Sequence, residues 1–166
     1  ILRFIRLLPV VKKPVIAGVD GAAIGIGTTL LFHCDLVYAT PGATFATPFL
    51  DLGLVPEAAS SLLMPAVMGH ARAFEMLVLG ETFTAERARD AGIVNALVPA
   101  ADLEAYVLGV AQRLDVAASL GEGLLVFHRA GDIDGKDELE VNLFGRGESR
   151  AEGENQAGCK SERADR

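Results

Sequence analysis

One carboxylate, Glu57, lies where a general base could act on a substrate. It follows Asp51 in the segment DLGLVPEAASSLLMP, residues 51–65, which contains no other charged residue. The prolines and serines of this segment predict a loop that leads into a helix. A carboxylate near a helix start is stabilised by about 0.3–1 kcal/mol without any function. Glu57 is therefore either a helix-start residue or a base that takes a proton from a carbon acid.

The glycine-rich stretch GVDGAAIGIGTT, residues 18–29, is a second place for chemistry. Its pattern predicts a strand, a tight turn and a helix whose first N–H groups can hold a developing negative charge. A dinucleotide-binding fingerprint needs GxGxxG, but Gly25-Ile26-Gly27 is followed by Thr-Thr-Leu, and no GK[ST] follows as in a P-loop. The stretch is therefore either a close helix–strand contact or an oxyanion hole.

The remaining nucleophilic or metal-binding residue types are weaker candidates. On a helix, adjacent His33 and Cys34 would point about 100° apart, so they do not form a dyad and we expect both in the core. Ser60 and Ser61 lack the GxSxG context of a hydrolase. Cys34 and Cys159 are far apart and no CxxC occurs, so we expect neither a disulfide framework nor a metal site.

Alternating strands and helices must position these residues. We expect strands at 15–19, 35–39 and 93–98, an extended run at 43–49, and helices at 1–8, 25–34, 59–68, 70–79, 84–91 and 102–114, the helix at 84–91 being ended by Gly92. This order predicts an α/β fold in which helices cover a sheet.

Composition and charge exclude several classes of protein. The 166 residues suit one domain with a real core, and the net charge of −7 gives no electrostatic reason to bind nucleic acid or an anionic membrane. The uncharged stretch 21–34 is too short to span a bilayer. The first residue is not Met and no signal-peptide cleavage site follows. We expect a cytoplasmic protein, of which this chain is a fragment.

The blocks KPVIAGVDGAAIGIGTTLLFHCDLVYAT (13–40) and ATFATPFLDLGLVPEAASS onward (43–99) resemble the crotonase superfamily, the enoyl-CoA hydratase/isomerase fold. The resemblance covers about residues 1–130. It implies an α/β fold of repeated ββα layers, incomplete at its N-terminus, with a core at 1–99 and a helical trimerisation-type region at 100–144. Residues 145–166 are rich in charge and poor in large apolar residues, so we expect a disordered tail.

The residues resemble one branch of this superfamily. Hydratases carry two catalytic glutamates, and the resemblance places Thr29 and Phe49 at those positions, so no carboxylate is available there. Glu57 falls where peroxisomal-type Δ3,Δ2-enoyl-CoA isomerases carry their single catalytic glutamate. Adding water needs the water activated and a proton delivered, whereas moving a double bond needs one base. The resemblance therefore implies isomerisation of 3-enoyl-CoA to 2-enoyl-CoA, in fatty acid degradation.

The same resemblance implies the rest of the site. A thioester enolate needs N–H donors at its oxygen, and the resemblance assigns one to the backbone of Ile26 and the other to a segment before Ile1. The substrate-binding residues that it implies are Ala23, Gly25, Gly27, Phe49 and Leu54. It also implies an acyl-CoA thioester substrate, no cofactor apart from that coenzyme A, and a homotrimer or dimer of trimers. Another crotonase activity (hydratase, thioesterase or dehalogenase) and a non-catalytic acyl-CoA-binding homologue remain as alternatives.

Overall fold

Two β-sheets form the centre of the computed structural model, which describes residues 2–11, 14–117, 124–129 and 142–144. The larger sheet has the order β6-β3-β1-β7-β8, in which β8 is antiparallel to β7 and the other pairs are parallel. The smaller sheet has the order β2-β4-β5. The strands are β1 (Val15–Asp20), β2 (Ala22–Ile24), β3 (Leu36–Ala39), β4 (Thr44–Ala46), β5 (Phe83–Thr84), β6 (Ala96–Leu97), β7 (Leu124–Arg129) and β8 (Asn142–Phe144).

The helices appear where the sequence predicts them. They are α1 (Leu2–Leu7), the 3-10 turn η1 (Leu8–Val10), α2 (Ile26–Thr29) with its 3-10 continuation η2 (Leu30–His33), α3 (Ser60–Met68), α4 (His70–Leu77), α5 (Ala85–Asp90) and α6 (Leu103–Ala117). Among the described residues, no helix combines the length and the hydropathy needed to cross a membrane.

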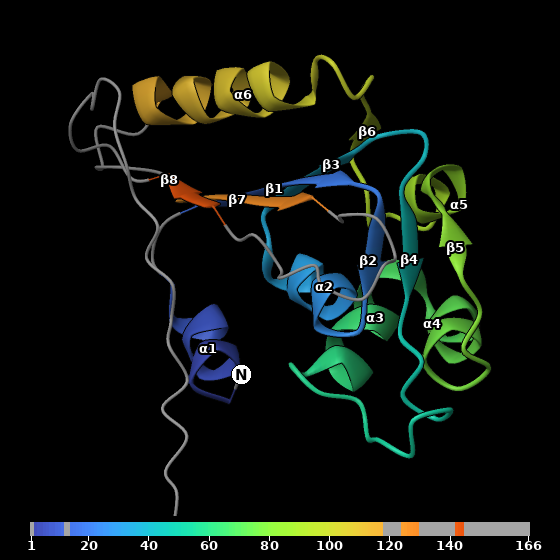
Figure 1. Ribbon diagram of the computed structural model, residues 1–166. Coiled ribbons are helices and arrows are strands. Elements are labelled where there is room, and N and C mark those ends of the chain that lie inside the picture. Colours follow the sequence, from blue (N-terminus) through green and yellow to red (C-terminus); the bar gives the residue numbers. More distant parts are fainter. Residues whose placement is uncertain (1, 12–13, 118–123, 130–141, 145–166) are drawn as a thin grey trace, which may run out of the picture.

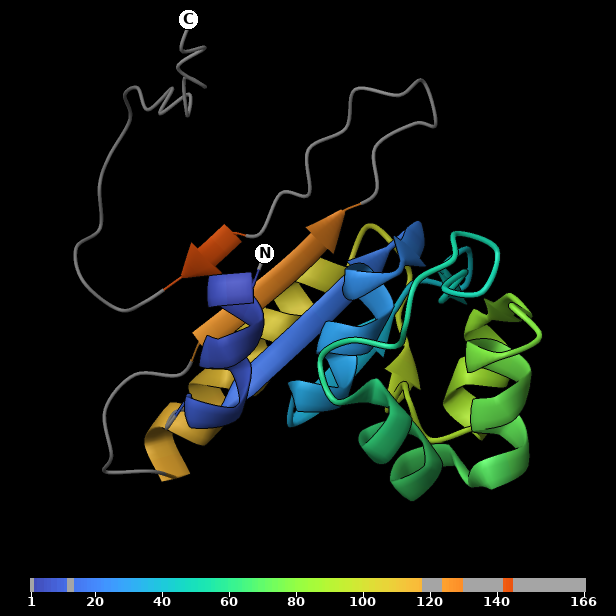
Figure 2. The same ribbon diagram turned by 90° about the horizontal axis from the view of Figure 1, so that it is seen from below.

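Side chains on the two faces of the large sheet enter different parts of the core, because successive residues of a strand point to opposite faces. Ile16 of β1 and Tyr38 of β3 pack with Val107 of α6. Their neighbours Ala17, Val19 and Ala39 belong to the cluster on the other face. Figure 1 shows α6 above the sheet and α2 below it, and Figure 2 shows α2 and η2 between β1 and α3. The predicted α/β fold with a helix-covered sheet is confirmed.

The glycine-rich turn contains a strand that the sequence did not predict. After β1 the chain turns at Gly21 (φ 92°) into β2, which pairs with β4. The Thr28 hydroxyl donates to the Ala23 carbonyl (2.6 Å) and accepts from the Ala46 N–H (3.2 Å). This buried threonine therefore joins α2 to both strands and fixes the start of α2 against the smaller sheet.

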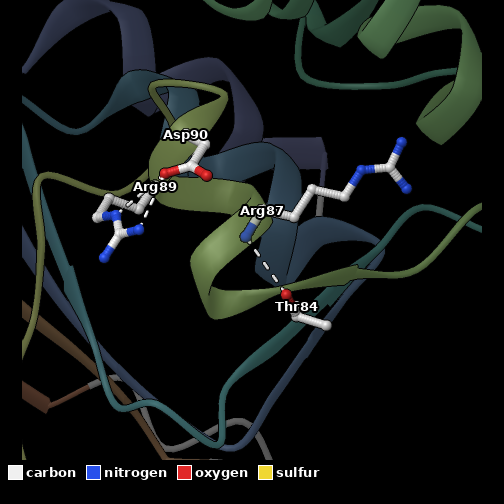
Figure 3. A network of polar contacts seen from close by, with 4 residues as sticks. All are labelled: Thr84, Arg87, Arg89 and Asp90. Carbon is white, nitrogen blue, oxygen red and sulfur yellow. Dashed lines mark hydrogen bonds and ion pairs between the residues drawn. The ribbon is translucent and has the colours of Figure 1, made fainter.

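Helix α5 shows how local sequence signals fix a boundary. The Thr84 hydroxyl accepts a hydrogen bond from the Arg87 N–H (3.3 Å), as an N-cap residue does, and Figure 3 shows this contact beside the Arg89–Asp90 ion pair (3.0 Å). Gly92 adopts φ 84° just after the helix, so its predicted role in ending the helix is confirmed.

Two expectations for the later part of the chain need correction. The region 100–144 was expected to be helical, but beyond α6 it contains strands β7 and β8. The physical reason is that the apolar run at the start of β7 pairs in parallel along the whole length of β1. The strand expected at 93–98 is reduced to β6, because the Asn95 side chain accepts the Val37 N–H (2.7 Å). The tail at 145–166 lies outside the described residues.

Candidate active site

The side chain of Glu57 points toward α2. It lies at the end of the loop between β4 and α3, and its Oε1 accepts a hydrogen bond from the Thr29 hydroxyl (2.5 Å). This distance is typical of a hydroxyl that donates to a carboxylate. The other oxygen, Oε2, is buried and has no hydrogen-bond partner among the described residues. One oxygen of the carboxylate is therefore held by a hydrogen bond, and the other is buried without one from any described residue.

A strained turn sets the direction of Glu57. The next two residues, Ala58 and Ala59, adopt the left-handed conformation with φ 50° and 54°, which costs an L-residue about 1–2 kcal/mol. The Ser60 N–H donates to the Glu57 carbonyl (2.9 Å), and His33 Nε2 donates to the Ala58 carbonyl (2.7 Å). These two bonds hold the turn, and α3 begins directly after it.

The glycine-rich turn lies against the same helix. Gly25 caps α2 with φ 58°, and its carbonyl accepts the N–H groups of Thr28 and Thr29 (both 3.0 Å). A Cβ at Gly25 would meet nothing within 4 Å, so this position requires glycine for its conformation and borders open space. Ile26 is the first helical residue, and its N–H has no acceptor within the helix. Since Thr29 follows one turn later, Glu57 contacts the same turn of α2 that begins with this N–H.

The substrate-binding residues that the resemblance implies lie in different environments. Ala23 and Gly27 are buried and shape the turn, and Phe49 (5% exposed) belongs to the core. Leu54 is 56% exposed on the loop, where its N–H donates to the Phe49 carbonyl (2.7 Å). No described contact joins Leu54 to Glu57. The binding roles of these residues, with that of Gly25, stay predictions.

Two polar residues of the site were missed at the level of sequence. The sequence marks Thr29 only as a position that lacks a glutamate, and it predicts His33 only as a core residue. The structure places both beside the 57–58 segment, where Thr29 bonds the Glu57 side chain and His33 bonds the Ala58 backbone. Residues four positions apart on a helix lie on the same face. That spacing was the signal that could have linked them.

Thiol and serine nucleophiles are not favoured here. Burial, with a smaller effect of the neighbouring Asp35, raises the pKa of the Cys34 thiol to about 12, so the reactive thiolate is scarce at neutral pH. Ser60 is fully buried and its hydroxyl has no partner among the described residues. In the same ranges, no three His, Cys, Asp or Glu side chains gather as a metal site would require.

Comparisons with known proteins agree on one family. A family model described as "Enoyl-CoA hydratase/isomerase" matches residues 2–121. Enoyl-CoA delta isomerase 2 of Rattus norvegicus is 47% identical over 95 residues, which cover 57% of this chain and 24% of that protein. The 4-chlorobenzoyl coenzyme A dehalogenase-1 of an Arthrobacter species is 33% identical over 121 residues, covering 73% of this chain and 44% of that protein.

A solved structure supports the same family. The enoyl-CoA hydratase/isomerase from Pseudoalteromonas atlantica is 40% identical and superposes with a TM-score of 0.69, over 70% of this chain and 47% of that one. In each of these matches, the chain spans less than half the length of the related protein.

Proposed function

This chain belongs to the enoyl-CoA hydratase/isomerase family, and from that premise we propose that the full-length protein converts a 3-enoyl-CoA to a 2-enoyl-CoA. Glu57 is the single acid/base residue, and the substrate brings its own coenzyme A, so no separate cofactor takes part. The observation that carries the proposal is the carboxylate of Glu57, which is held through one oxygen by a threonine and has its second oxygen buried without a partner among the described residues.

The proposed reaction moves one proton and one double bond. Glu57 takes a proton from C2 of the 3-enoyl thioester, and the electron pair left behind forms a dienolate whose negative charge lies on the thioester oxygen. The Ile26 N–H donates to that oxygen, and a second donor comes from a part of the protein outside this sequence. Glu57 then returns the proton to C4, which leaves the double bond between C2 and C3 and regenerates the carboxylate.

The contact between Thr29 and Glu57 favours isomerisation over hydration. Hydration needs one group to activate water and another to deliver a proton, which suits two carboxylates. Here the side chain facing Glu57 is a hydroxyl whose proton is directed at Glu57 Oε1. The higher identity to a delta isomerase (47%) than to a dehalogenase (33%) supports the same choice.

Dehalogenation of an aromatic acyl-CoA is the second candidate. It is favoured by the 33% identity to the 4-chlorobenzoyl coenzyme A dehalogenase, which extends over 73% of this chain. Both candidates use an acyl-CoA thioester, so substrate class alone does not separate them.

The assembly and location follow as further proposals. We propose a homotrimer or dimer of trimers in the cytoplasm, on the basis of the family resemblance. Analytical ultracentrifugation of the full-length protein tests the first, and imaging of a tagged protein tests the second.

A panel of three thioesters tests the reaction. The full-length protein is incubated separately with 3-hexenoyl-CoA, crotonyl-CoA and 4-chlorobenzoyl-CoA, and products are followed by NMR. The proposal predicts 2-hexenoyl-CoA as the main product. Faster release of chloride or faster hydration of crotonyl-CoA contradicts it, and inertness toward all three supports a non-catalytic homologue.

A further inference from the structure

We propose that Thr29 is a positioning residue, whose hydroxyl holds Glu57 Oε1 and leaves Oε2 as the oxygen that exchanges the substrate proton. This inference rests on the proposed acid/base role of Glu57. It assigns a function to a residue that stands where the family's hydratases, by the resemblance, carry a carboxylate. In this chain the position supplies a hydrogen-bond donor in place of a second acid.

The hydrogen-bond inventory of the Thr29 hydroxyl supports the assignment. A hydroxyl has one proton to donate. Its oxygen lies 2.5 Å from Glu57 Oε1 and 3.5 Å from the Ile26 carbonyl, so the short contact takes the proton. Thr29 is fully buried in α2, and its branched side chain has few rotamers. The donor is therefore fixed in direction, and it makes the two oxygens of the carboxylate unequal.

The second oxygen of the Glu57 carboxylate, Oε2, has a different environment from Oε1. This oxygen is buried and lacks a hydrogen-bond partner among the described residues. Because no hydrogen bond from a described residue occupies Oε2, no such bond has to be broken before this oxygen takes a proton from C2 of the thioester. The oxygen that can accept the substrate proton is thus the one that Thr29 does not hold.

A second contact from the same helix fixes the backbone of the base. His33, four residues after Thr29, donates from Nε2 to the Ala58 carbonyl (2.7 Å), and Ala58 is one of the two left-handed alanines. The helix α2–η2 therefore holds the segment at two points, the side chain of Glu57 through Thr29 and the Ala58–Ala59 peptide through His33. Only the Thr29 contact sets which oxygen faces the substrate.

Substitutions at Thr29 separate positioning from simple stability. Thr29→Val keeps the shape and removes the hydroxyl, and Thr29→Ser keeps the hydroxyl. A displaced catalytic group lowers turnover by about 10²-fold for 1 Å, so we expect Thr29→Val to lower kcat by about 10–100-fold with little change in KM. Thr29→Ser should restore most of the rate.

The matched control is Thr40→Val. The Thr40 hydroxyl also donates to a carboxylate, that of Asp20 (3.0 Å), and Thr40 is buried. Neither residue belongs to the proposed site. This variant loses the same kind of bond and should lower the thermal midpoint while leaving kcat unchanged.

The test measures two reactions of 3-hexenoyl-CoA in D2O with the full-length wild type and the three variants. NMR follows isomerisation, and mass spectrometry follows deuterium uptake into the unreacted thioester. The expected result is that Thr29→Val slows both, while Thr29→Ser and Thr40→Val do not. Equal rates for Thr29→Val and the wild type overturn the positioning role, as does an equal loss in Thr29→Val and Thr40→Val. If the wild type takes up deuterium without isomerising the thioester, and Thr29→Val slows that uptake, the role of Thr29 stands and the proposed reaction is overturned. If the wild type shows neither deuterium uptake nor isomerisation, both proposals are overturned.

Discussion

The Thr29 hydroxyl and the Glu57 carboxylate, 28 positions apart in the sequence, are joined by a 2.5 Å hydrogen bond. Through this bond the glycine-rich helix start and the loop that carries the lone acid become neighbours. The two stretches that chemistry alone singled out in the sequence therefore belong to one site. Each of them had a purely structural explanation, and their meeting is what favours the functional one.

The contact predicts poor hydration. By the family resemblance, Thr29 and Phe49 occupy the positions at which hydratases carry carboxylates, so we expect the full-length protein to have no second acid at these positions to activate water. Crotonyl-CoA should be hydrated much more slowly than 3-hexenoyl-CoA is isomerised, as measured under the same conditions by ultraviolet absorbance and NMR. A hydration rate equal to the isomerisation rate would show that other residues serve as the second acid.

The turn after Glu57 predicts a stabilising substitution. Ala59 adopts φ 54° and is exposed, so glycine at this position removes the left-handed strain without loss of packing. Since the strain is about 1–2 kcal/mol and glycine costs about 0.5–1 kcal/mol in chain entropy, Ala59→Gly should raise the free energy of unfolding by up to about 1.5 kcal/mol.

The control for that substitution lies in the following helix. Ala66 is exposed in α3, where glycine only adds entropy to the unfolded chain, so Ala66→Gly should lower the free energy of unfolding by about 0.5–1 kcal/mol. Thermal or urea unfolding of both variants gives the comparison. A destabilisation of the same size in Ala59→Gly and Ala66→Gly would mean that the turn at Ala59 is not strained.

The Cys34 thiol should be unreactive in the folded protein. Burial raises its pKa from 9.0 to about 12, and only the thiolate reacts with iodoacetamide. At pH 8, alkylation of Cys34 should be slow until the protein is unfolded by urea, with mass spectrometry separating Cys34 from Cys159. Cys34 is partly buried, and rapid labelling of the native protein at this residue would contradict the raised pKa.

The same shift predicts how stability depends on pH. The folded protein favours the neutral thiol, whereas the unfolded chain loses the proton near pH 9. This contribution to stability is therefore fully present below pH 9 and is lost as the pH rises toward 12. Cys34→Ala should remove this part of the decline between pH 9 and 12 in urea-unfolding curves, and an unchanged decline would contradict the shift.

Local signals in the sequence were enough for much of the fold. The strand predicted at 15–19 is β1, and the predicted helix at 84–91, ended by Gly92, is α5. Short elements that depend on distant partners were not predictable. Strand β2 exists because its three residues pair with β4, and β7 because it pairs with β1.

The site, too, was predictable from the sequence only in part. The types and spacing of the residues marked Glu57 and the glycine-rich stretch as candidates, and the family resemblance alone assigned a donor role to Ile26, which stays a prediction. The direction of the Glu57 side chain was not predictable, because it depends on a hydroxyl of another helix and on two alanines in a conformation that alanine rarely adopts.

The central claim, that Glu57 is the base, is tested most directly by Glu57→Gln in the full-length protein. Gln keeps the size of the side chain and an oxygen that can accept the Thr29 hydrogen bond, but it cannot take a proton from C2. Isomerisation of 3-hexenoyl-CoA should fall by about 10²–10⁴-fold, while calorimetry should give an unchanged affinity for the product 2-hexenoyl-CoA. The exposed Glu81→Gln serves as the matched control and should retain full activity. Turnover of Glu57→Gln close to that of the wild type would contradict the account.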